Sequence, residues 1–337
     1  MKYLLGVDGG SSKTHALLAE SSGRVLGFGN SGSANHQSYG LQSAMSQLEL
    51  AVNLAYERAG ISPGQVALGY FCLAGADLSE DFAMLQEAVE ALHLAGKVII
   101  KNDTLAALRA GLSRSWGVVV ICGTGFNAAG RSPDGCEIVL PGLGLISGDW
   151  GGGGELSQEV IRAVMRAWDG RGQPTLLTTL VLATLELPSE QALLSKLYHD
   201  EIDHGQLLDL VKLLFEAAAA GDEVARELII QMGTEVGITA NALLKRLALE
   251  HTDAEVVLGG SVFKGQGDLL IDTASQLIHE VAPRARIIRP RFEPVVGALL
   301  QALEAAGLKV TPQRLARLSA SLPEMLLLRD KGGGEKG

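Results

Sequence analysis

The chain has 337 residues, of which 47% are hydrophobic and 20% are charged, a composition typical of a globular protein long enough for two domains. Its formal net charge is -10 and no run of Lys or Arg offsets it, so we expect neither a nucleic acid nor an anionic membrane surface as partner. The apolar stretch at the N-terminus ends at Asp8, which is too early for a signal peptide. No uncharged apolar run is long enough to span a membrane, and we therefore expect a cytoplasmic protein.

The first part of the chain predicts strands followed by a helix. Residues 3–8 and 14–20 are apolar enough for two strands, and the turn at 21–23 leads into a third, which makes an antiparallel meander. Apolar side chains then recur at helical spacing over 41–59, and Gly60 stands where a helix-ending glycine belongs. This helix should face the core.

Strands and helices alternate further along the chain. A strand over 66–73, a helix over 77–94 and a strand over 97–101 form a β–α–β unit, the signature of a mostly parallel sheet. The scheme of the N-terminus restarts over 116–139, with three short strands separated by turns. We therefore expect two lobes of similar design.

The second half is mainly helical. Ala- and Leu-rich helices fill 155–250, a strand returns at 255–262, and Pro294 opens a helix that ends near Gly307. The predicted parts are an N-terminal lobe of residues 1–115 plus 294–310, a C-terminal lobe of residues 116–293, and a disordered tail at 331–337.

A Gly-rich turn follows the first strand. It reads Asp8-Gly9-Gly10-Ser11-Ser12-Lys13-Thr14. A carboxylate at a strand end, followed by small residues that offer N–H and hydroxyl donors, suits a polyphosphate with its magnesium ion. The turn is not a P-loop, because Ser12 stands where glycine is required before Lys13 and a strand follows instead of a helix. A plain hairpin turn is the alternative interpretation.

Two further turns of this kind follow apolar strands. They read Cys122-Gly123-Thr124-Gly125-Phe126-Asn127 and Gly259-Gly260-Ser261. The first offers small residues and a hydroxyl, as the N-terminal turn does, and the second offers flat backbone against which an adenosine could lie. Three such turns are hard to explain as unconnected hairpins.

Three polar residues are candidates for binding or chemistry, each with a structural alternative. Asp103 ends a strand directly before a helix and could accept a proton from a substrate hydroxyl, or it could cap the helix. Asp149 could bind sugar hydroxyls or cap the helix near Glu155. Asn35 could contact a ligand or form an Asx-turn.

The cysteines are few and widely spaced. Cys72, Cys122 and Cys136 are odd in number, and each lies in or near an apolar, strand-like segment. This pattern predicts reduced, buried thiols instead of a metal or iron–sulfur site.

The ordered motifs resemble the acetate and sugar kinase, Hsp70 and actin superfamily, and more closely the N-acetylglucosamine kinase branch of the BadF/BadG/BcrA/BcrD ATPase family. The motifs are GVDGGSSKT, NH, LAGAD, KNDT, CGTGFN, GLGLISGDWG, AAAAGD, GGSV and EPVVGALL. The resemblance implies an α/β fold of two ribonuclease H-like, actin-like ATPase lobes, each a mixed sheet flanked by helices, with ATP and sugar in a cleft between them. It also implies an ATP-dependent kinase of an amino sugar, with the 6-hydroxyl of N-acetylglucosamine as the expected acceptor, and a homodimer.

The resemblance also implies roles for individual residues. Asp8 would hold Mg²⁺ through water, and Asp103 would be the general base. The expected ATP contacts are Gly9, Gly10, Ser11, Ser12, Lys13, Gly123, Thr124, Gly125, Ala218, Gly260 and Ser261. The expected sugar contacts are Asn35, Gly75, Asp103, Asn127, Gly142, Leu143 and Asp149.

The sequence departs from the family pattern at the sugar end. Trp150 stands where the family usually has an acidic residue, and Leu143 stands where it often has Trp. Trp150 could be a sugar-stacking platform or a core residue. Two other functions stay open: an ATPase that activates a partner reductase through a shared iron–sulfur cluster, and a nucleotide-binding module without phosphotransfer.

Overall fold

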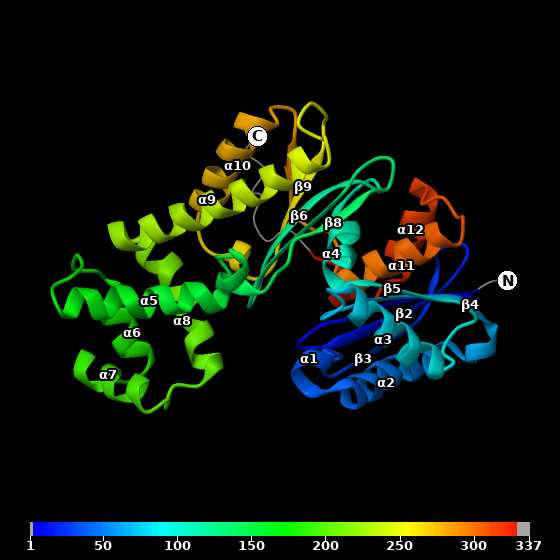
Figure 1. Ribbon diagram of the computed structural model, residues 1–337, viewed down its shortest axis with the longest axis horizontal. Coiled ribbons are helices and arrows are strands. Elements are labelled where there is room, and N and C mark those ends of the chain that lie inside the picture. The colour runs from blue at the N-terminus through cyan, green and yellow to red at the C-terminus, as the bar shows by residue number, and fades with distance from the viewer. Residues whose placement is uncertain (1–2, 329–337) are drawn as a thin grey trace. The chain divides into compact units, whose positions relative to one another are not determined.

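The computed structural model describes residues 3–328, which form two compact units. Figure 1 shows their helices and strands with labels. Within the described residues, the first unit comprises 3–119, 129–139 and 288–328, and the second comprises 120–128 and 140–287.

The first sheet has five strands in the order β3-β2-β1-β4-β5. The strands are β1 (Tyr3–Gly9), β2 (Thr14–Glu20), β3 (Val25–Ser31), β4 (Val66–Leu73) and β5 (Val98–Asn102). β2 pairs antiparallel with β1 and β3, as the predicted meander requires, whereas β4 pairs parallel with β1 and β5. The predicted mixed sheet is therefore confirmed.

Helices cover both faces of this sheet (Figure 1). The helices of the first unit are α1 (His36–Tyr39), α2 (Leu41–Ala59), α3 (Ser79–Ala91), α4 (Asp103–Gly111), α11 (Pro294–Ala305) and α12 (Pro312–Ser321). α2 and α3 pack into the hydrophobic cluster on one face, and α4, α11 and α12 pack into the cluster on the other. α2 ends at Gly60 in the left-handed conformation, as predicted.

Helix α11 lies very close to strand β1 and to helix α4. A Cβ added at Gly6 would lie 2.3 Å from Leu299 N, and one added at Gly297 would lie 1.9 Å from Ala106 O. The two glycines therefore let three backbone segments meet. This contact fixes α4 and α11 relative to β1.

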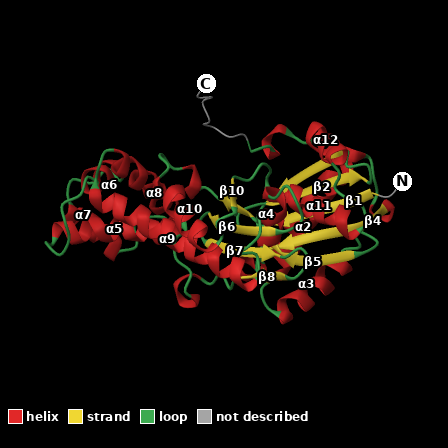
Figure 2. Cartoon of the chain, turned by 90° about the horizontal axis from the view of Figure 1, so that it is seen from above, coloured by secondary structure: helices red, strands yellow, loops and turns green. Residues whose placement is uncertain are grey.

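The second sheet also has five strands, in the order β10-β9-β6-β7-β8, and Figure 2 shows the strands of both sheets in yellow. The strands are β6 (Gly117–Cys122), β7 (Phe126–Arg131), β8 (Glu137–Val139), β9 (Glu255–Gly259) and β10 (Arg286–Ile288). The helices of the second unit are α5 (Gly153–Trp168), α6 (Leu177–Thr184), α7 (Glu190–Tyr198), α8 (His204–Ala219), α9 (Glu223–Arg246) and α10 (Leu269–Val281). The predicted restart of strands and the helical segment over 155–250 are both confirmed.

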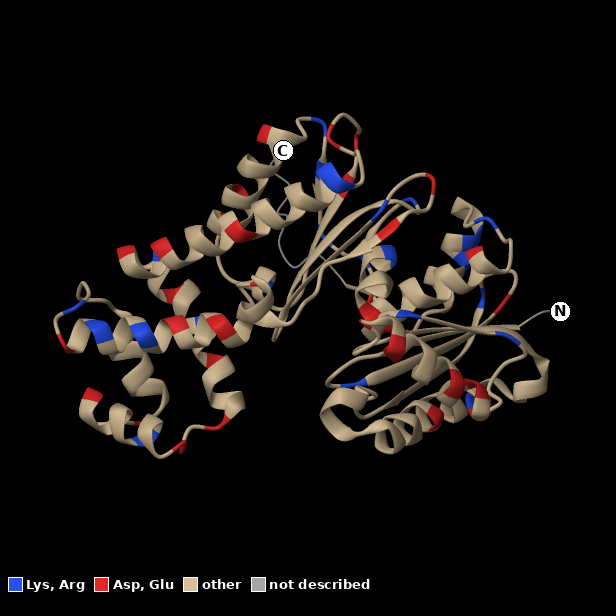
Figure 3. Cartoon of the chain, viewed as in Figure 1, with Lys and Arg blue, Asp and Glu red and all other residues tan. Residues whose placement is uncertain are grey.

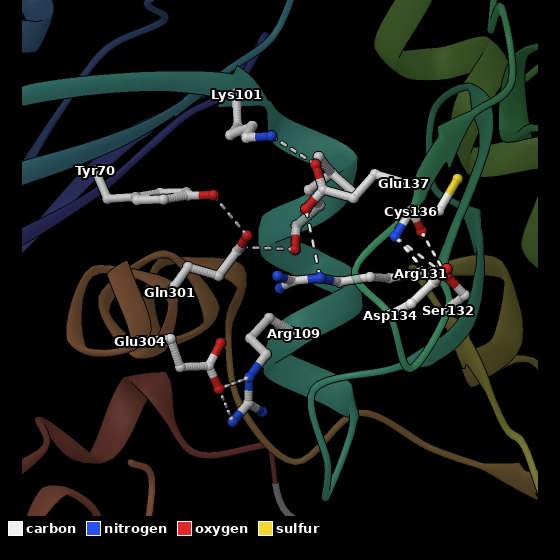
Figure 4. Close-up of polar contacts among 11 residues, drawn as sticks. Tyr70, Lys101, Arg109, Arg131, Ser132, Asp134, Cys136, Glu137, Gln301 and Glu304 are labelled. Atoms are coloured by element: carbon white, nitrogen blue, oxygen red, sulfur yellow. Dashed lines mark hydrogen bonds and ion pairs between the residues drawn. The ribbon is translucent and has the colours of Figure 1, made fainter. Parts of the chain in front are cut away.

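Residues 129–139, which include most of the β7–β8 hairpin, belong to the first unit although the hairpin extends the second sheet. Lys101 of β5 donates to Glu137 of β8 at 2.5 Å, and Arg131 Nε lies 3.7 Å from the other oxygen of Glu137 (Figure 4). Beside this network, Tyr70 donates to Gln301 at 3.0 Å and so links β4 to α11. The first unit thus includes residues that the sequence assigned to the C-terminal lobe at 116–293, because these side chains tie the hairpin to β5.

Two local details differ from the sequence prediction. The helix expected over 77–94 is shorter, since α3 ends at Ala91 and the backbone turns left-handed at His93 (φ 52°). Cys136 was predicted to be buried and is exposed, because it lies in the turn between β7 and β8, whereas Cys72 and Cys122 are buried. The predicted tail at 331–337 lies outside the described residues, and none of the helices within 3–328 has the length and apolarity to cross a membrane.

Candidate functional site

Three strands of the first sheet end at the same edge. β1, β4 and β5 are parallel neighbours, so their carboxyl ends lie side by side. Asp8 lies at the end of β1, Gly75 follows β4, and Asp103 follows β5. The structure therefore brings together three predicted site residues that are distant in the sequence.

Asp8 is a buried carboxylate with 8% of its surface exposed. Among the described residues its side chain makes no hydrogen bond or ion pair. The pKa of Asp8 is raised to about 8, first by burial and then by the charge of Asp103, while Lys13 acts in the opposite direction. A buried carboxylate without a donor is costly, so Asp8 suits a site that a cation enters.

Asp103 is the first residue of α4 and does not cap it. Asn102 takes that role, because its Oδ1 accepts from Thr104 N at 2.9 Å while its Nδ2 donates to Asp77 at 2.9 Å. The pKa of Asp103 is raised to about 6, mainly by burial and then by Asp77. Asp103 is thus ionised at neutral pH and able to take up a proton.

The turn after β1 is held from several sides. Ala74 N donates to Gly9 O at 2.8 Å, and Ala34 N donates to Gly10 O at 3.2 Å. Ser12 and Lys13 lie on the exposed part of the turn. Their donor groups are therefore available to a ligand that approaches the end of β1.

Asn35 connects this turn to helix α1. Its Oδ1 accepts from Gln37 N at 2.9 Å and so caps α1, while its Nδ2 donates to Ser11 Oγ at 2.9 Å. Gly75 packs against the ring of His36, the next residue. Both interpretations of Asn35 are thus compatible with the structure: it forms an Asx-turn and it lies beside the Ser11 hydroxyl.

The charge at this edge of the sheet is mainly negative. Asp77 lies close enough to Asp103 to raise the pKa of Asp103. Glu293 lies close enough to Asp8 to raise the pKa of Asp8, and it also pairs with Lys13 at 3.0 Å. Elsewhere Lys and Arg are interspersed with Asp and Glu over both units (Figure 3). A polyphosphate would need a divalent cation to approach such a set of carboxylates.

The turn after β6 is open and uncharged. A Cβ added at Gly123 or at Gly125 would meet no atom within 4 Å, and neither residue has left-handed backbone. The start of α5 fastens the turn, because Gly153 N donates to Gly123 O at 2.8 Å and Gly154 N donates to Thr124 O at 2.9 Å. Neither packing nor left-handed backbone therefore requires a glycine at these two positions.

The turn after β9 lies directly beside the turn after β6. A Cβ added at Gly260 would lie 2.2 Å from Cys122 O, and Gly260 has φ +106°. The exposed Ser261 begins a short 3₁₀ helix whose end packs on α8, since a Cβ added at Gly265 would lie 2.5 Å from the Phe215 ring. Ala218 lies one helical turn further along α8. The structure thus places Gly260 beside Cys122 and the end of the 3₁₀ helix beside α8, the helix that carries Ala218.

Two of the predicted sugar contacts meet in the second unit. A Cβ added at Gly142 would lie 2.3 Å from Asn127 Oδ1, so the Asn127 side chain faces the Gly142 backbone. Leu140 N donates to Ala128 O at 2.9 Å and holds the two segments together. Asn127 and Gly142 therefore form one local group.

Ser147 folds the segment that carries Leu143 and Asp149. Leu143 N donates to Ser147 Oγ at 2.9 Å, and the Ser147 hydroxyl donates to the Asp149 carboxylate. Asp149 does not cap α5, whose N-cap is Gly152. Leu143 is 63% exposed and Trp150 is partly buried, so Trp150 is not a core residue.

A magnesium ion fits this chain only in company with another ligand. No group of three or more His, Cys, Asp or Glu within residues 3–328 could hold a metal by itself. Mg²⁺ usually keeps several waters and binds through one or two carboxylates plus substrate phosphates, a pattern that suits Asp8. Cys72 and Cys122 lie in strands of different sheets, and burial raises the pKa of each thiol.

Sequence reasoning missed two residues near these groups. Asn102 caps α4 in place of Asp103, and its position before the helix was a visible signal, because Asn is a preferred N-cap residue. Glu293 precedes Pro294 at the start of α11 and contacts Lys13. The sequence carries no comparable signal for that contact.

Two mixed sheets flanked by helices, with small-residue turns after their strands, define the fold shared by actin-like ATPases and ROK sugar kinases. The family model of the BadF/BadG/BcrA/BcrD ATPase family matches residues 5–302, and the chain belongs to this family. Use of ATP follows from that membership.

Named relatives match over nearly their whole length. An N-acetylmuramic acid/N-acetylglucosamine kinase of Clostridium acetobutylicum is 27% identical, with 89% of this chain and 98% of the relative covered. An N-acetyl-D-glucosamine kinase of Dictyostelium discoideum is 29% identical, with 90% of this chain and 98% of the relative covered. Among solved structures, a provisionally named N-acetylglucosamine kinase of Chromobacterium violaceum has a TM-score of 0.68 at 24% identity, with 90% and 99% covered, and this likeness concerns the fold.

Proposed function

We propose that this chain transfers the γ-phosphate of Mg-ATP to a hydroxyl of an amino sugar, with the 6-hydroxyl of N-acetylglucosamine as the first acceptor to test. Family membership and the names of the relatives support a sugar kinase. The observation that carries the proposal is the Asp103 carboxylate, which stands at the sheet edge beside Asp8 while Asn102 does the capping. Asp103 is therefore not the N-cap of α4.

The nucleotide would be held mainly by backbone and hydroxyl donors. The proposed contacts are Gly9, Gly10, Ser11, Ser12, Lys13, Gly123, Thr124, Gly125, Ala218, Gly260 and Ser261. Asp8 would hold Mg²⁺ through water, and the ion would neutralise charge on the phosphates. The Lys13 ammonium adds a positive charge for the same phosphates.

Asp103 acts as the general base in this proposal. It accepts the proton of the acceptor hydroxyl while that oxygen forms a bond to the γ-phosphorus, and the bond from the γ-phosphorus to the bridging oxygen breaks to release ADP. A pKa raised to about 6 keeps Asp103 ionised at neutral pH yet basic enough to hold the proton.

The acceptor would be held by side chains and backbone groups near the ends of strands. The proposed contacts are Asn35, Gly75, Asp103, Asn127, Gly142, Leu143 and Asp149. These side chains and backbone groups offer amide, carboxylate and N–H partners for the hydroxyl and acetamido groups of a sugar. A homodimer is part of the proposal and is checked by light scattering.

A coupled assay with Mg-ATP and a panel of sugars tests this function, run beside Asp103→Asn. We expect turnover that depends on an amino sugar, and we expect Asp103→Asn to lower kcat by about 10³-fold, within the range for a lost general base. The variant should still bind Mg-ATP and keep its melting temperature, which separates lost chemistry from lost folding. Sugar-dependent turnover that survives the substitution would refute the base assignment.

A further inference from the structure

Glu293 is a carboxylate beside the proposed nucleotide site that the mechanism above does not use. It occupies the N-cap position of α11, where a side chain ordinarily accepts a hydrogen bond from its own helix. The Glu293 side chain makes no such bond. Instead it pairs with Lys13 Nζ at 3.0 Å, so its position needs an explanation other than capping.

The position of Glu293 is rigid. Val295 and Val296, in the first turn of α11, are fully buried. Glu293 N donates to Leu326 O at 3.0 Å, which fixes the backbone before the helix. With Gly6 in contact with the backbone of α11, the carboxylate is presented from a fixed element at the end of β1.

The surroundings of Glu293 contain buried polar groups without partners. Asp8 is 8% exposed, and its carboxylate makes no hydrogen bond with the described residues. His15 is 5% exposed, and its Nδ1 has no partner within that part of the chain. His15 is the strand partner of Asp8 across β1 and β2, so both side chains lie on the same face of the sheet as α11. Unpaired buried polar groups at one place need a partner, which a bound ligand can supply.

We propose that Glu293 is a second carboxylate, beside Asp8, for the magnesium ion of Mg-ATP, and that Lys13 neutralises it until the nucleotide binds. This inference rests on the proposed function. When Mg-ATP binds, the Lys13 ammonium would leave Glu293 and pair with a phosphate oxygen. The charge of the Glu293 carboxylate would then be neutralised by the magnesium ion. Free ATP brings no such cation, so its phosphates meet an unneutralised Glu293. The residue therefore makes nucleotide binding selective for the metal complex.

Equilibrium binding of ATP by calorimetry, with excess Mg²⁺ and with EDTA, tests this selectivity in Glu293→Gln. The wild type should bind Mg-ATP more tightly than free ATP, and the variant should reduce the ratio of the two dissociation constants by about tenfold, the scale of one partly screened charge contact. Affinity for free ATP should stay equal or increase, because Lys13 is released. Glu293→Asp should restore part of the ratio.

Glu304→Gln is the matched control. Glu304 lies on the same helix, forms an ion pair with Arg109, and has a side chain 24% exposed, against 21% for Glu293. The control should leave the ratio unchanged. An unchanged ratio in Glu293→Gln, or a parallel weakening of both affinities, would overturn the inference. If the wild type prefers Mg-ATP but phosphorylates no sugar, the proposed function is wrong. The metal role of Glu293 is still supported in that case if Glu293→Gln lowers the ratio of the two dissociation constants.

Discussion

The turns at residues 8–14 and 122–127 both follow buried strands, yet they differ in charge and in packing. The first carries Asp8 and Lys13, and its backbone is hydrogen-bonded to the segments after β3 and β4. The second has no charged side chain, and its two glycines have open space around them. The first turn therefore supplies charge, and the second supplies only backbone and a hydroxyl.

Gly260 shows what a structurally required glycine looks like in the same unit. It combines left-handed backbone with a near contact to Cys122, whereas Gly123 has neither. The comparison separates glycines kept for folding from glycines available for a ligand. Substitutions at Gly260 and Gly123 test this distinction between the glycines. A series of pH values tests the difference in charge between the two turns.

The largest effect is expected for Gly260→Ala. The new Cβ would lie 2.2 Å from a backbone oxygen, and φ +106° disfavours any side chain, so we expect a loss of about 2–4 kcal/mol in the free energy of unfolding. Urea denaturation measures this loss. If Gly260→Ala were as stable as the wild type, the distinction between the two turns would be wrong.

Gly123→Ala should affect binding instead of folding. The open space and the ordinary backbone predict a change in unfolding free energy within about 1 kcal/mol, while a methyl group against the phosphates should weaken Mg-ATP binding by about tenfold or more. Calorimetry measures the affinity. Gly64→Ala is the control, because Gly64 has equal space and lies in a short 3₁₀ helix after α2, and it should not change the affinity. Equal affinities for all three proteins would contradict the role of the second turn.

The smallest effect concerns the charge of the first turn. The pKa of Asp8 is about 8 in the folded protein, against 3.8 for an ordinary aspartate. Between these values the folded state keeps a proton that the unfolded chain has lost, so the stability of the ligand-free protein should fall as pH rises, by at least about 1 kcal/mol. Denaturation at pH 5 and pH 8 tests this slope.

Asp8→Asn should flatten that pH dependence, whereas Asp209→Asn, at an exposed ion pair with Lys212, should not change it. Asp103 adds a slope of the same sign up to about pH 6, because burial raises its pKa as well. A stability profile in which Asp8→Asn follows the wild type at all pH values would show that Asp8 is not a buried, unpaired carboxylate.

The amino-acid sequence by itself determined the order of strands and helices, because apolar periodicity and Gly-rich turns are local signals. It also located Asp8 and Asp103, since each lies at the end of an apolar strand. It could not decide between capping and catalysis for Asp103, because an Asp and an Asn side by side before a helix are both suitable caps.

Only the tertiary structure decided the contacts between segments that are distant in the chain. Lys13 meets Glu293, and Lys101 meets Glu137, because helix α11 and the β7–β8 hairpin pack against the ends of β1 and β5. The exposure of Cys136 depends on the same hairpin. Such contacts arise from the packing of whole elements, and the spacing of residues along one element contains no record of them.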